Sequence, residues 1–197
     1  MRAYWTRRHL LFGAVAATLA PAAAQDRPAA GLRPEVYLLR GFADVFSEGL
    51  DQMGAALDAR GIDAHVQGHQ GWRSAARRIV EDRRRGLAGR VVLIGHSLGA
   101  NAVIRMAEAL QREGIAVDLL ITLAATAPRP VPGNVRRAVN YYFQKHGWGE
   151  PLVAAPGFRG RMLNKDYSGM AEVGHFNIDK QRSVQAEILS LTVAAAR

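Results

Sequence analysis

The chain has 197 residues, of which 49% are hydrophobic and 22% are charged, and it contains no cysteine. These values are ordinary for a globular protein, so they exclude a mostly disordered chain, a collagen-like repeat and a disulfide-stapled mini-protein. The lack of cysteine also excludes disulfides, Cys-ligated zinc and a Cys nucleophile. Covalent catalysis by this chain would therefore need another side chain.

The first 24 residues have the three regions of an export signal in the right order. A basic start is followed by an apolar stretch at 10–20 and by Ala22-Ala23-Ala24, which offers a small-x-small cleavage site. The apolar stretch is too short to span a bilayer. We therefore expect a cleavable signal over 1–24, one mature domain over 25–197 and a periplasmic or secreted bacterial location. Because residues 6–11 (TRRHLL) also resemble a twin-arginine motif, either export route is open.

Removal of the signal leaves 23 basic and 17 acidic residues, a net charge of +6. Seven arginines gather between residues 73 and 90. A solvated helix face explains such a run, and attraction to an anionic surface of the cell envelope is the alternative. No nucleic-acid-binding motif accompanies the arginines, so we do not expect nucleic acid as a partner.

Short β-branched runs alternate with amphipathic segments along the mature chain, which predicts a parallel sheet with helices. In chain order we expect a strand at 35–40, a helix with apolar positions 46, 50, 53 and 57, a strand at 62–67, a helix at 72–85, a strand at 90–95, a long helix from 98, strands at 117–123, 138–143 and 161–165, and a last helix at about 179–195. No linker or internal repeat interrupts this pattern, so the sequence predicts a single domain.

The sharpest motif lies between the strand at 90–95 and the long helix, where Gly95-His96-Ser97-Leu98-Gly99 has the form G-x-S-x-G. A serine at the tip of such a tight turn has a strained backbone, and side chains at the flanking positions would collide with the strand and helix. The helix N-terminus would stabilise negative charge that develops beside Ser97. The motif predicts a nucleophile at Ser97, and a plain strand-to-helix turn is the alternative.

A serine hydroxyl needs a base, and His175 is the best candidate among the six histidines. It lies in a glycine-led loop between the last predicted strand and the last predicted helix. The other histidines are expected to leave with the signal, to point away from Ser97, to be structural within a strand, or to lie in surface loops; they are, in that order, His9, His96, His65, and both His69 and His146.

These motifs resemble those of small α/β-hydrolases of the lipase, esterase and thioesterase group, over nearly the whole mature chain. GHSLG at 95–99 is a form common among lipases, and the segment 38–42 (LLRGF) resembles the start of the family's oxyanion loop. The resemblance implies a reduced α/β-hydrolase fold, a mostly parallel sheet of about six strands with helices on both faces and no cap domain. It also implies that the backbone amides of Leu98 and Phe42 bind the oxyanion, and that no metal or other cofactor is needed.

The acid that should orient the catalytic histidine is not evident. Relatives often carry it after the family's sixth strand, but the corresponding residues here, 123–126 (LAAT), include no carboxylate. Asp166, which directly follows the last predicted strand, is our first choice for this role, Glu150 is the second, and Asp44 is a further candidate. A turn-forming aspartate explains Asp166 equally well.

Together these residues predict an exported serine hydrolase that cleaves a small-molecule or lipid carboxylic ester through an acyl-enzyme on Ser97. Aromatic residues in or beside the predicted loops, Trp72, Trp148 and Tyr167, are candidates for the substrate pocket. Two alternatives stay open. One is a hydrolase fold that has lost turnover and binds a ligand of the cell envelope, and the other is a serine amidase or peptidase on the same fold.

Overall fold

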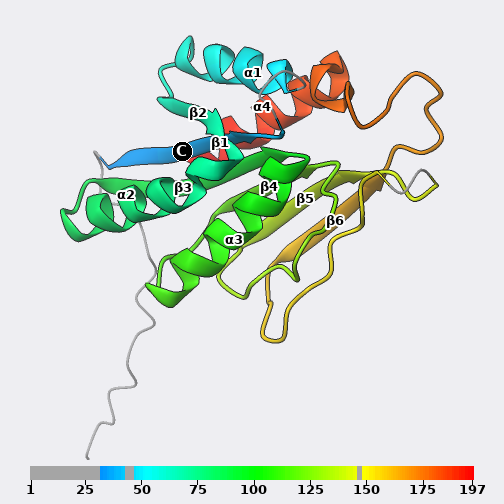
Figure 1. Cartoon of the computed structure of the whole chain (residues 1–197). Helices are drawn as coiled ribbons and strands as arrows, with labels where there is room; N and C mark the ends of the chain where they lie inside the picture. Colours follow the sequence, from blue (N-terminus) through cyan, green and yellow to red (C-terminus); the bar gives the residue numbers. More distant parts are fainter. Residues whose placement is uncertain (1–31, 43–46, 146–147) are drawn as a thin grey trace, which may run out of the picture.

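The computed structural model describes residues 32–42, 47–145 and 148–197. Six strands in this part of the chain form one parallel sheet with the order β2-β1-β3-β4-β5-β6 (Figure 1). The strands are β1 (Arg33–Arg40), β2 (Ala64–Gly68), β3 (Ala88–His96), β4 (Leu119–Leu123), β5 (Arg137–Tyr142) and β6 (Arg161–Asp166). The helices are α1 (Glu48–Asp58), α2 (Trp72–Arg84), α3 (Leu98–Arg112) and α4 (Arg182–Ala196), with 3₁₀ turns η1 (His69–Gly71) and η2 (Ile178–Lys180).

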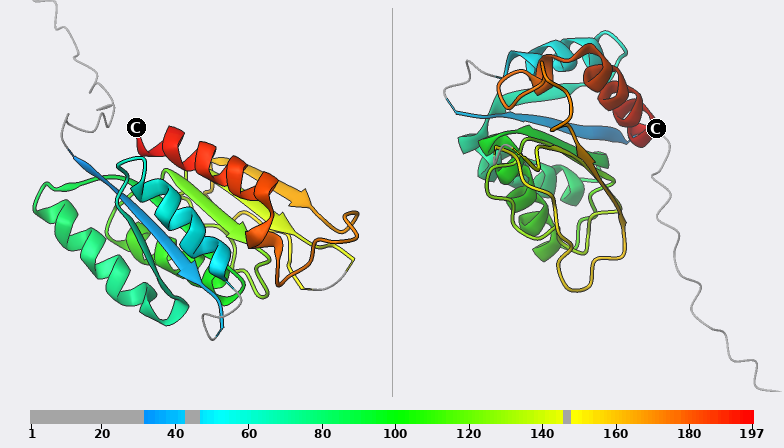
Figure 2. Two further views of the ribbon diagram at one scale, coloured as in Figure 1. Left: turned by 90° about the horizontal axis from the view of Figure 1, so that it is seen from above. Right: turned by 90° about the vertical axis from the view of Figure 1, so that its right-hand side faces the viewer.

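Helices cover both faces of the sheet (Figures 1 and 2). In β1, Val36 and Leu38 pack on the side of α1 and α4, whereas Tyr37 and Leu39 pack on the side of α2 and α3. This alternation explains why the central strands are continuous apolar runs, since both of their faces are buried. The predicted six-stranded sheet with helices on both faces is confirmed.

Each strand and helix that the sequence predicts is present, with shifted ends. The predicted helix position at Phe46 lies outside the described residues, as does the proposed signal over 1–24. The last helix begins at Arg182, later than expected, because Gln181 has an extended backbone that separates η2 from α4. No helix in the described part of the chain is both long and apolar enough to cross a membrane.

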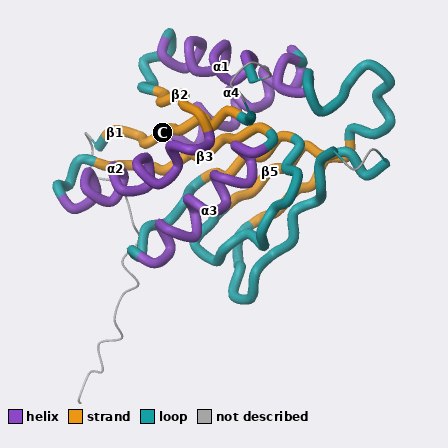
Figure 3. Tube along the Cα trace, viewed as in Figure 1, coloured by secondary structure: helices purple, strands orange, loops and turns teal. Residues whose placement is uncertain are grey.

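Loops replace helices in the connections from β4 to β5 and from β5 to β6 (Figure 3). The loop after β5 begins at Phe143, and its described part is anchored to the loop after β4, because the Glu150 N–H donates to the carbonyl of Ala125 at 2.8 Å. No cap domain is present among the described residues. The loops after β4 and β5 therefore meet at the carboxyl edge of the sheet.

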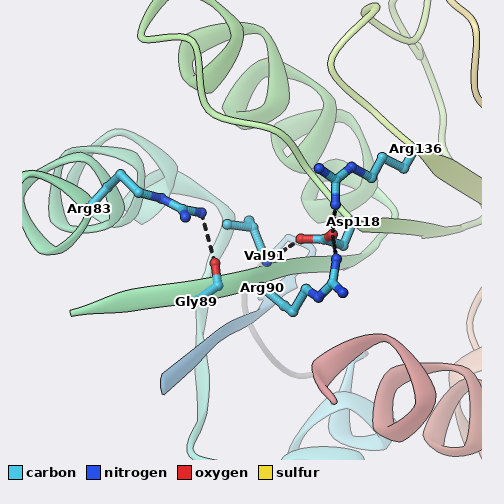
Figure 4. A network of polar contacts seen from close by, with 6 residues as sticks. All are labelled: Arg83, Gly89, Arg90, Val91, Asp118 and Arg136. Carbon is cyan, nitrogen blue, oxygen red and sulfur yellow. Dashed lines mark hydrogen bonds and ion pairs between the residues drawn. The ribbon is translucent and has the colours of Figure 1, made fainter. Parts of the chain in front are cut away.

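An ion-pair network fastens the opposite, amino edge of the sheet (Figure 4). The carboxylate of Asp118, just before β4, accepts hydrogen bonds from the Arg90 and Arg136 guanidinium groups at 2.9 and 2.7 Å and from the Val91 N–H at 2.9 Å. These contacts join the beginnings of β3, β4 and β5. This network does not involve the carboxyl edge, which is where open α/β sheets bind their ligands.

Candidate active site

Ser97 occupies a strained turn between β3 and α3. Its backbone has φ 57° and ψ −119°, a conformation that residues with a side chain seldom adopt. A Cβ atom on Gly95 would lie 2.3 Å from the carbonyl oxygen of Gly99, and a Cβ on Gly99 would lie 1.8 Å from that of Leu39. Only glycine fits at both flanking positions, for the steric reason that the sequence motif suggested.

The structure brings His175 to Ser97. The Nε2 atom of His175 lies 2.9 Å from Ser97 Oγ, and its Nδ1 atom lies 2.8 Å from the backbone carbonyl oxygen of Trp148. Because a carbonyl oxygen only accepts, Nδ1 carries the proton and Nε2 presents its lone pair to the Ser97 hydroxyl. Burial lowers the pKa of His175 below its usual value of 6.5, so the ring is neutral near pH 7.

The backbone carbonyl of Trp148 lies at His175 Nδ1, where a carboxylate was expected. The prediction that Asp166 orients the histidine is therefore wrong. Asp166 is exposed at the end of β6, and its carboxylate accepts the backbone N–H groups of Ser168 at 2.9 Å and Gln144 at 3.3 Å. It is thus the turn-forming aspartate of the alternative interpretation. No carboxylate of the described residues is hydrogen-bonded to His175, Glu150 included; Asp44 lies outside the described residues.

Small residues after β4 allow the Trp148 carbonyl to reach the histidine. Ala124 is buried, with φ 50°, and a Cβ on Gly149 would lie only 3.0 Å from its Cα. The chain at Gly149 is further held by the Phe143 N–H, which donates to its carbonyl at 3.2 Å. The loop after β5 therefore packs directly on the two alanines that stand where a triad acid was sought.

The segment predicted to form the oxyanion loop lies against the nucleophile. A Cβ on Gly41 would be 3.0 Å from the Cβ of Ser97, so the peptide that joins Gly41 to Phe42 is beside it. Leu98 is the first residue of α3, where backbone N–H groups have no acceptor within the helix. These positions suit the two amides, of Phe42 and Leu98, that the resemblance assigned to an oxyanion hole.

A cavity of about 340 Å³ surrounds Ser97 and His175. Three aromatic side chains form its apolar rim, and they are exposed by 70%, 54% and 51%: Phe42, Trp148 and Phe176, respectively. The Trp148 and Phe176 rings lie 5.1 and 5.0 Å from the His175 ring, measured between centroids. Sequence reasoning missed Phe176, although an aromatic residue directly after the expected base was an available signal.

Two of the predicted pocket residues lie elsewhere. Trp72 is in the groove between α2 and α3, where it packs against the core and the Arg73 guanidinium covers its ring at 4.5 Å. Tyr167 packs against Tyr141 near α4, with 5.7 Å between ring centroids. Both are therefore packing residues, and their rings lie against the core. Only Trp148 of the three predicted aromatics lines the cavity.

Three solved structures are similar to this chain. The type II thioesterase BorB from the borrelidin biosynthetic cluster superposes with a TM-score of 0.50 at 14% identity, over 87% of this chain and 96% of BorB. The thioesterase RedJ from the prodiginine pathway of Streptomyces coelicolor gives 0.50 at 14% identity, over 91% of this chain and 96% of RedJ. A Xanthomonas campestris protein of the α/β hydrolase superfamily gives 0.46 at 16% identity, over 81% and 98%.

No protein-family model and no curated protein matches the sequence. At these identities the structural likeness concerns the fold alone. The chain has the α/β-hydrolase fold that the GHSLG motif and the strand pattern led us to expect. Among the described residues, no group of three or more His, Asp or Glu side chains is placed to hold a metal ion.

Proposed function

We propose that the protein is a serine hydrolase that cleaves carboxylic esters through an acyl-enzyme on Ser97. The observation that carries this proposal is the contact of 2.9 Å between Ser97 Oγ and His175 Nε2, at a strained turn that opens α3. A nucleophile and a base within hydrogen-bond reach, with the base oriented by a third group, are the shared requirement of serine hydrolases. Here the third group is the carbonyl of Trp148.

The geometry suits a two-step transfer. Ser97 Oγ attacks the substrate carbonyl carbon while Nε2 of His175 accepts the hydroxyl proton, and the oxyanion is stabilised by the Phe42 and Leu98 amides. The imidazolium then gives that proton to the leaving alcohol, so that the acyl group stays on Ser97. Water then attacks the acyl-enzyme ester as it gives a proton to the same Nε2 atom, and the imidazolium returns that proton to Ser97 Oγ as the acid is released.

The lack of a carboxylate bonded to His175 among the described residues favours a second candidate, a hydrolase fold with impaired turnover that binds a ligand. A triad acid stabilises the imidazolium with a full negative charge, whereas the Trp148 carbonyl offers only a dipole to His175. The dipole still fixes the tautomer and orientation of the ring. We favour the enzyme because a fixed tautomer and a fixed orientation position His175 as a base. A binding protein would not require Ser97 to be nucleophilic, so the reactivity of Ser97 distinguishes the two candidates.

The apolar rim of the cavity supports substrates with an apolar group next to the scissile bond. Phe42, Trp148 and Phe176 expose their rings around the nucleophile, and an apolar acyl or alcohol group would bury them. BorB and RedJ, two of the similar structures, are thioesterases, so thioesters belong in the substrate panel beside esters and amides. An amide preference would move the proposal to a serine amidase or peptidase.

Reaction with a fluorophosphonate tests the proposal without any assumption about the substrate. Intact-mass analysis and peptide mapping should find one adduct, on Ser97, which is absent from Ser97→Ala and reduced in His175→Ala. Ser168→Ala, which removes an exposed hydroxyl that binds the backbone of Lys145, should label like the wild type. No adduct on a folded protein would contradict the enzyme and favour the binding protein.

We also propose that the protein is exported, because of its N-terminal sequence alone. When the protein is expressed in a bacterium, it should be recovered from the periplasm or medium with the mass of a chain that begins at Gln25. Retention of Met1 on cytoplasmic protein would contradict this. Replacement of Arg7 and Arg8 by lysine should block export only if the twin-arginine route is used.

A further inference from the structure

A continuous chain of buried hydrogen bonds joins the oxyanion loop to the histidine loop. The Gly41 N–H donates to Ser47 Oγ at 3.0 Å, Ser47 Oγ lies 2.9 Å from His96 Nδ1, and His96 Nε2 lies 2.7 Å from the carbonyl oxygen of His175. Ser47 is fully buried and His96 is 1% exposed. The sequence prediction that the His96 side chain avoids the nucleophile is compatible with this, but it missed the role of the ring.

Each hydrogen bond in this series has only one possible direction. The His175 carbonyl only accepts, so His96 Nε2 carries the proton. Burial, together with the charge of Lys180 and the His175 ring, lowers the pKa of His96 to about 4, so the ring is neutral and Nδ1 accepts. The Ser47 hydroxyl therefore donates to Nδ1, and its oxygen accepts from Gly41.

The two ends of this hydrogen-bond chain lie at the proposed oxyanion hole and at the proposed base. Gly41 precedes Phe42, whose amide is one of the proposed oxyanion donors, and His175 is the proposed base. Between them, His96 ends β3, the central strand that also leads into Ser97. The carbonyl of Gly41 is bound independently by His69 Nδ1, at 3.1 Å. Because a trans peptide directs its C=O and N–H in opposite directions, this contact fixes the direction of the Phe42 amide.

A plainly structural role would not require these polar groups. Burial of an imidazole and a hydroxyl carries a desolvation cost that apolar side chains of similar volume would avoid. What the polar pair adds is direction, since hydrogen bonds fix the angle at which each loop meets Ser97.

We propose that Ser47 and His96 are positioning residues that hold the oxyanion loop and the histidine loop in register with Ser97. The inference rests on the proposed function. It implies that a break in this hydrogen-bond chain lowers the rate of acyl transfer while substrate binding is largely kept, because Ser47 and His96 line the cavity from buried positions and neither side chain reacts. A displaced oxyanion donor or base costs about 10-fold to 100-fold in rate.

Steady-state hydrolysis of a p-nitrophenyl ester tests the inference on the Ser47 side. Ser47→Ala should lower kcat by about 10-fold to 100-fold with KM within about threefold of the wild type. Ser47→Thr keeps the hydroxyl and should recover most of kcat. Asn134→Ala is the matched control, because Asn134 donates to the carbonyls of Ala107 and Ile115 at the far edge of the sheet. It should lose stability but keep kcat.

Two amide variants at His96 each break one of the two hydrogen bonds that its ring makes. His96→Asn places a polar atom near the Nδ1 position and loses the contact with the His175 carbonyl, whereas His96→Gln places one near Nε2 and loses the contact with Ser47. Both should lower kcat. Only His96→Asn should also raise the midpoint of the acidic limb of the pH profile, because a looser histidine loop exposes the His175 ring and reduces the effect of burial on its pKa.

The outcomes separate this inference from the proposed function. A folded wild type without a fluorophosphonate adduct on Ser97 would overturn the proposed function and this inference with it. A wild type that labels and hydrolyses esters, beside a Ser47→Ala variant that keeps kcat within about twofold, would overturn the inference alone. So would a loss of kcat in Asn134→Ala equal to that in Ser47→Ala, because both losses would then follow stability.

Discussion

At the scale of single residues, the carbonyl of Trp148 separates two tasks that one carboxylate usually performs. It orients the His175 ring by accepting the Nδ1 proton at 2.8 Å, but it brings no full negative charge to the imidazolium that forms during the reaction. Because no carboxylate of the described part of the chain is bonded to this ring, the histidine should be easier to keep neutral. The cost appears in the transition state, where the positive ring is less stabilised.

The pH dependence of activity follows from this arrangement. Burial lowers the pKa of His175, and the base works only when neutral, so kcat/KM should fall with a midpoint below pH 6.5 as the pH decreases. A pH profile with an uncharged ester would measure this. A midpoint at or above pH 7 would contradict it and indicate an anionic partner of the ring.

Asp166→Asn gives a second residue-level prediction. Asp166 accepts backbone N–H groups in an exposed turn and does not contact His175, so kcat should stay within about twofold of the wild type. Ester hydrolysis by Asp166→Asn and by Glu150→Gln, measured beside His175→Ala, checks this. A loss of more than 100-fold in Asp166→Asn alone would restore Asp166 as the triad acid.

The sequence predicted those site residues whose side chains leave a pattern. Gly95 and Gly99 mark the turn because a Cβ at either position collides with backbone, and a glycine-led loop before the last helix marks His175. The carbonyl of Trp148 leaves no pattern, since every residue has one and its direction depends on the path of the loop. A search for a nearby carboxylate therefore led to Asp166, whose turn is local.

At the scale of elements, the junction between η2 and α1 joins the two halves of the site. The Asp179 side chain in η2 accepts the N–H of Gly49 in the first turn of α1 at 2.9 Å. A Cβ on Gly49 would lie 2.1 Å from the Asp179 carbonyl oxygen, so the two elements are in close contact. Since α1 follows the oxyanion loop and η2 follows the histidine loop, this junction supports both.

Asp179 makes the junction sensitive to pH. Burial raises its pKa to about 6, against the opposing effects of the Gly49 hydrogen bond and Lys180, while Glu48 adds to the increase. The folded state thus binds the proton more tightly than the unfolded state does. The stability that this proton contributes is present at pH 4 and is lost as the pH rises through about 6.

Asp179→Asn should remove that loss, because an amide is neutral at every pH and keeps an oxygen for Gly49. Its free energy of unfolding should match the wild type near pH 4 and exceed it by about 2 kcal/mol at pH 8. Urea unfolding between pH 4 and pH 8 measures the difference. Asp166→Asn is the control: its carboxyl has a pKa lowered by hydrogen bonds, so it should not gain stability at high pH. An equal gain in both variants would contradict the assignment to Asp179.

Strands and helices were more predictable than the ends and junctions that connect them. The apolar runs of β3 and β4 and the spacing of Leu50, Met53 and Leu57 in α1 follow from burial on two faces or one. The break at Gln181 and the capping of α1 by Asp179 depend on contacts between segments far apart in sequence. No local pattern encodes such contacts.

At the scale of the whole molecule, basic and apolar surfaces lie on different parts of the fold. The apolar rim surrounds Ser97 at the carboxyl edge of the sheet, whereas α2 exposes a series of arginines. Figure 1 shows that α2 lies on the same face of the sheet as α3. Arg85, which directly follows α2, is exposed, and so are all five arginines of the helix: Arg73, Arg77, Arg78, Arg83 and Arg84. With a net charge of +6 for residues 25–197, this face would attract an anionic surface.

Binding to anionic vesicles tests that expectation. The mature protein should sediment with vesicles of phosphatidylglycerol and phosphatidylcholine but not with phosphatidylcholine alone, and about 0.5 M salt should release it because the charges are screened. Arg77→Gln combined with Arg78→Gln should weaken binding several-fold. Arg161→Gln combined with Arg182→Gln changes the net charge equally from β6 and α4, and it should have a smaller effect. Equal losses in the two double variants would mean that net charge alone, and not the α2 face, determines the attraction.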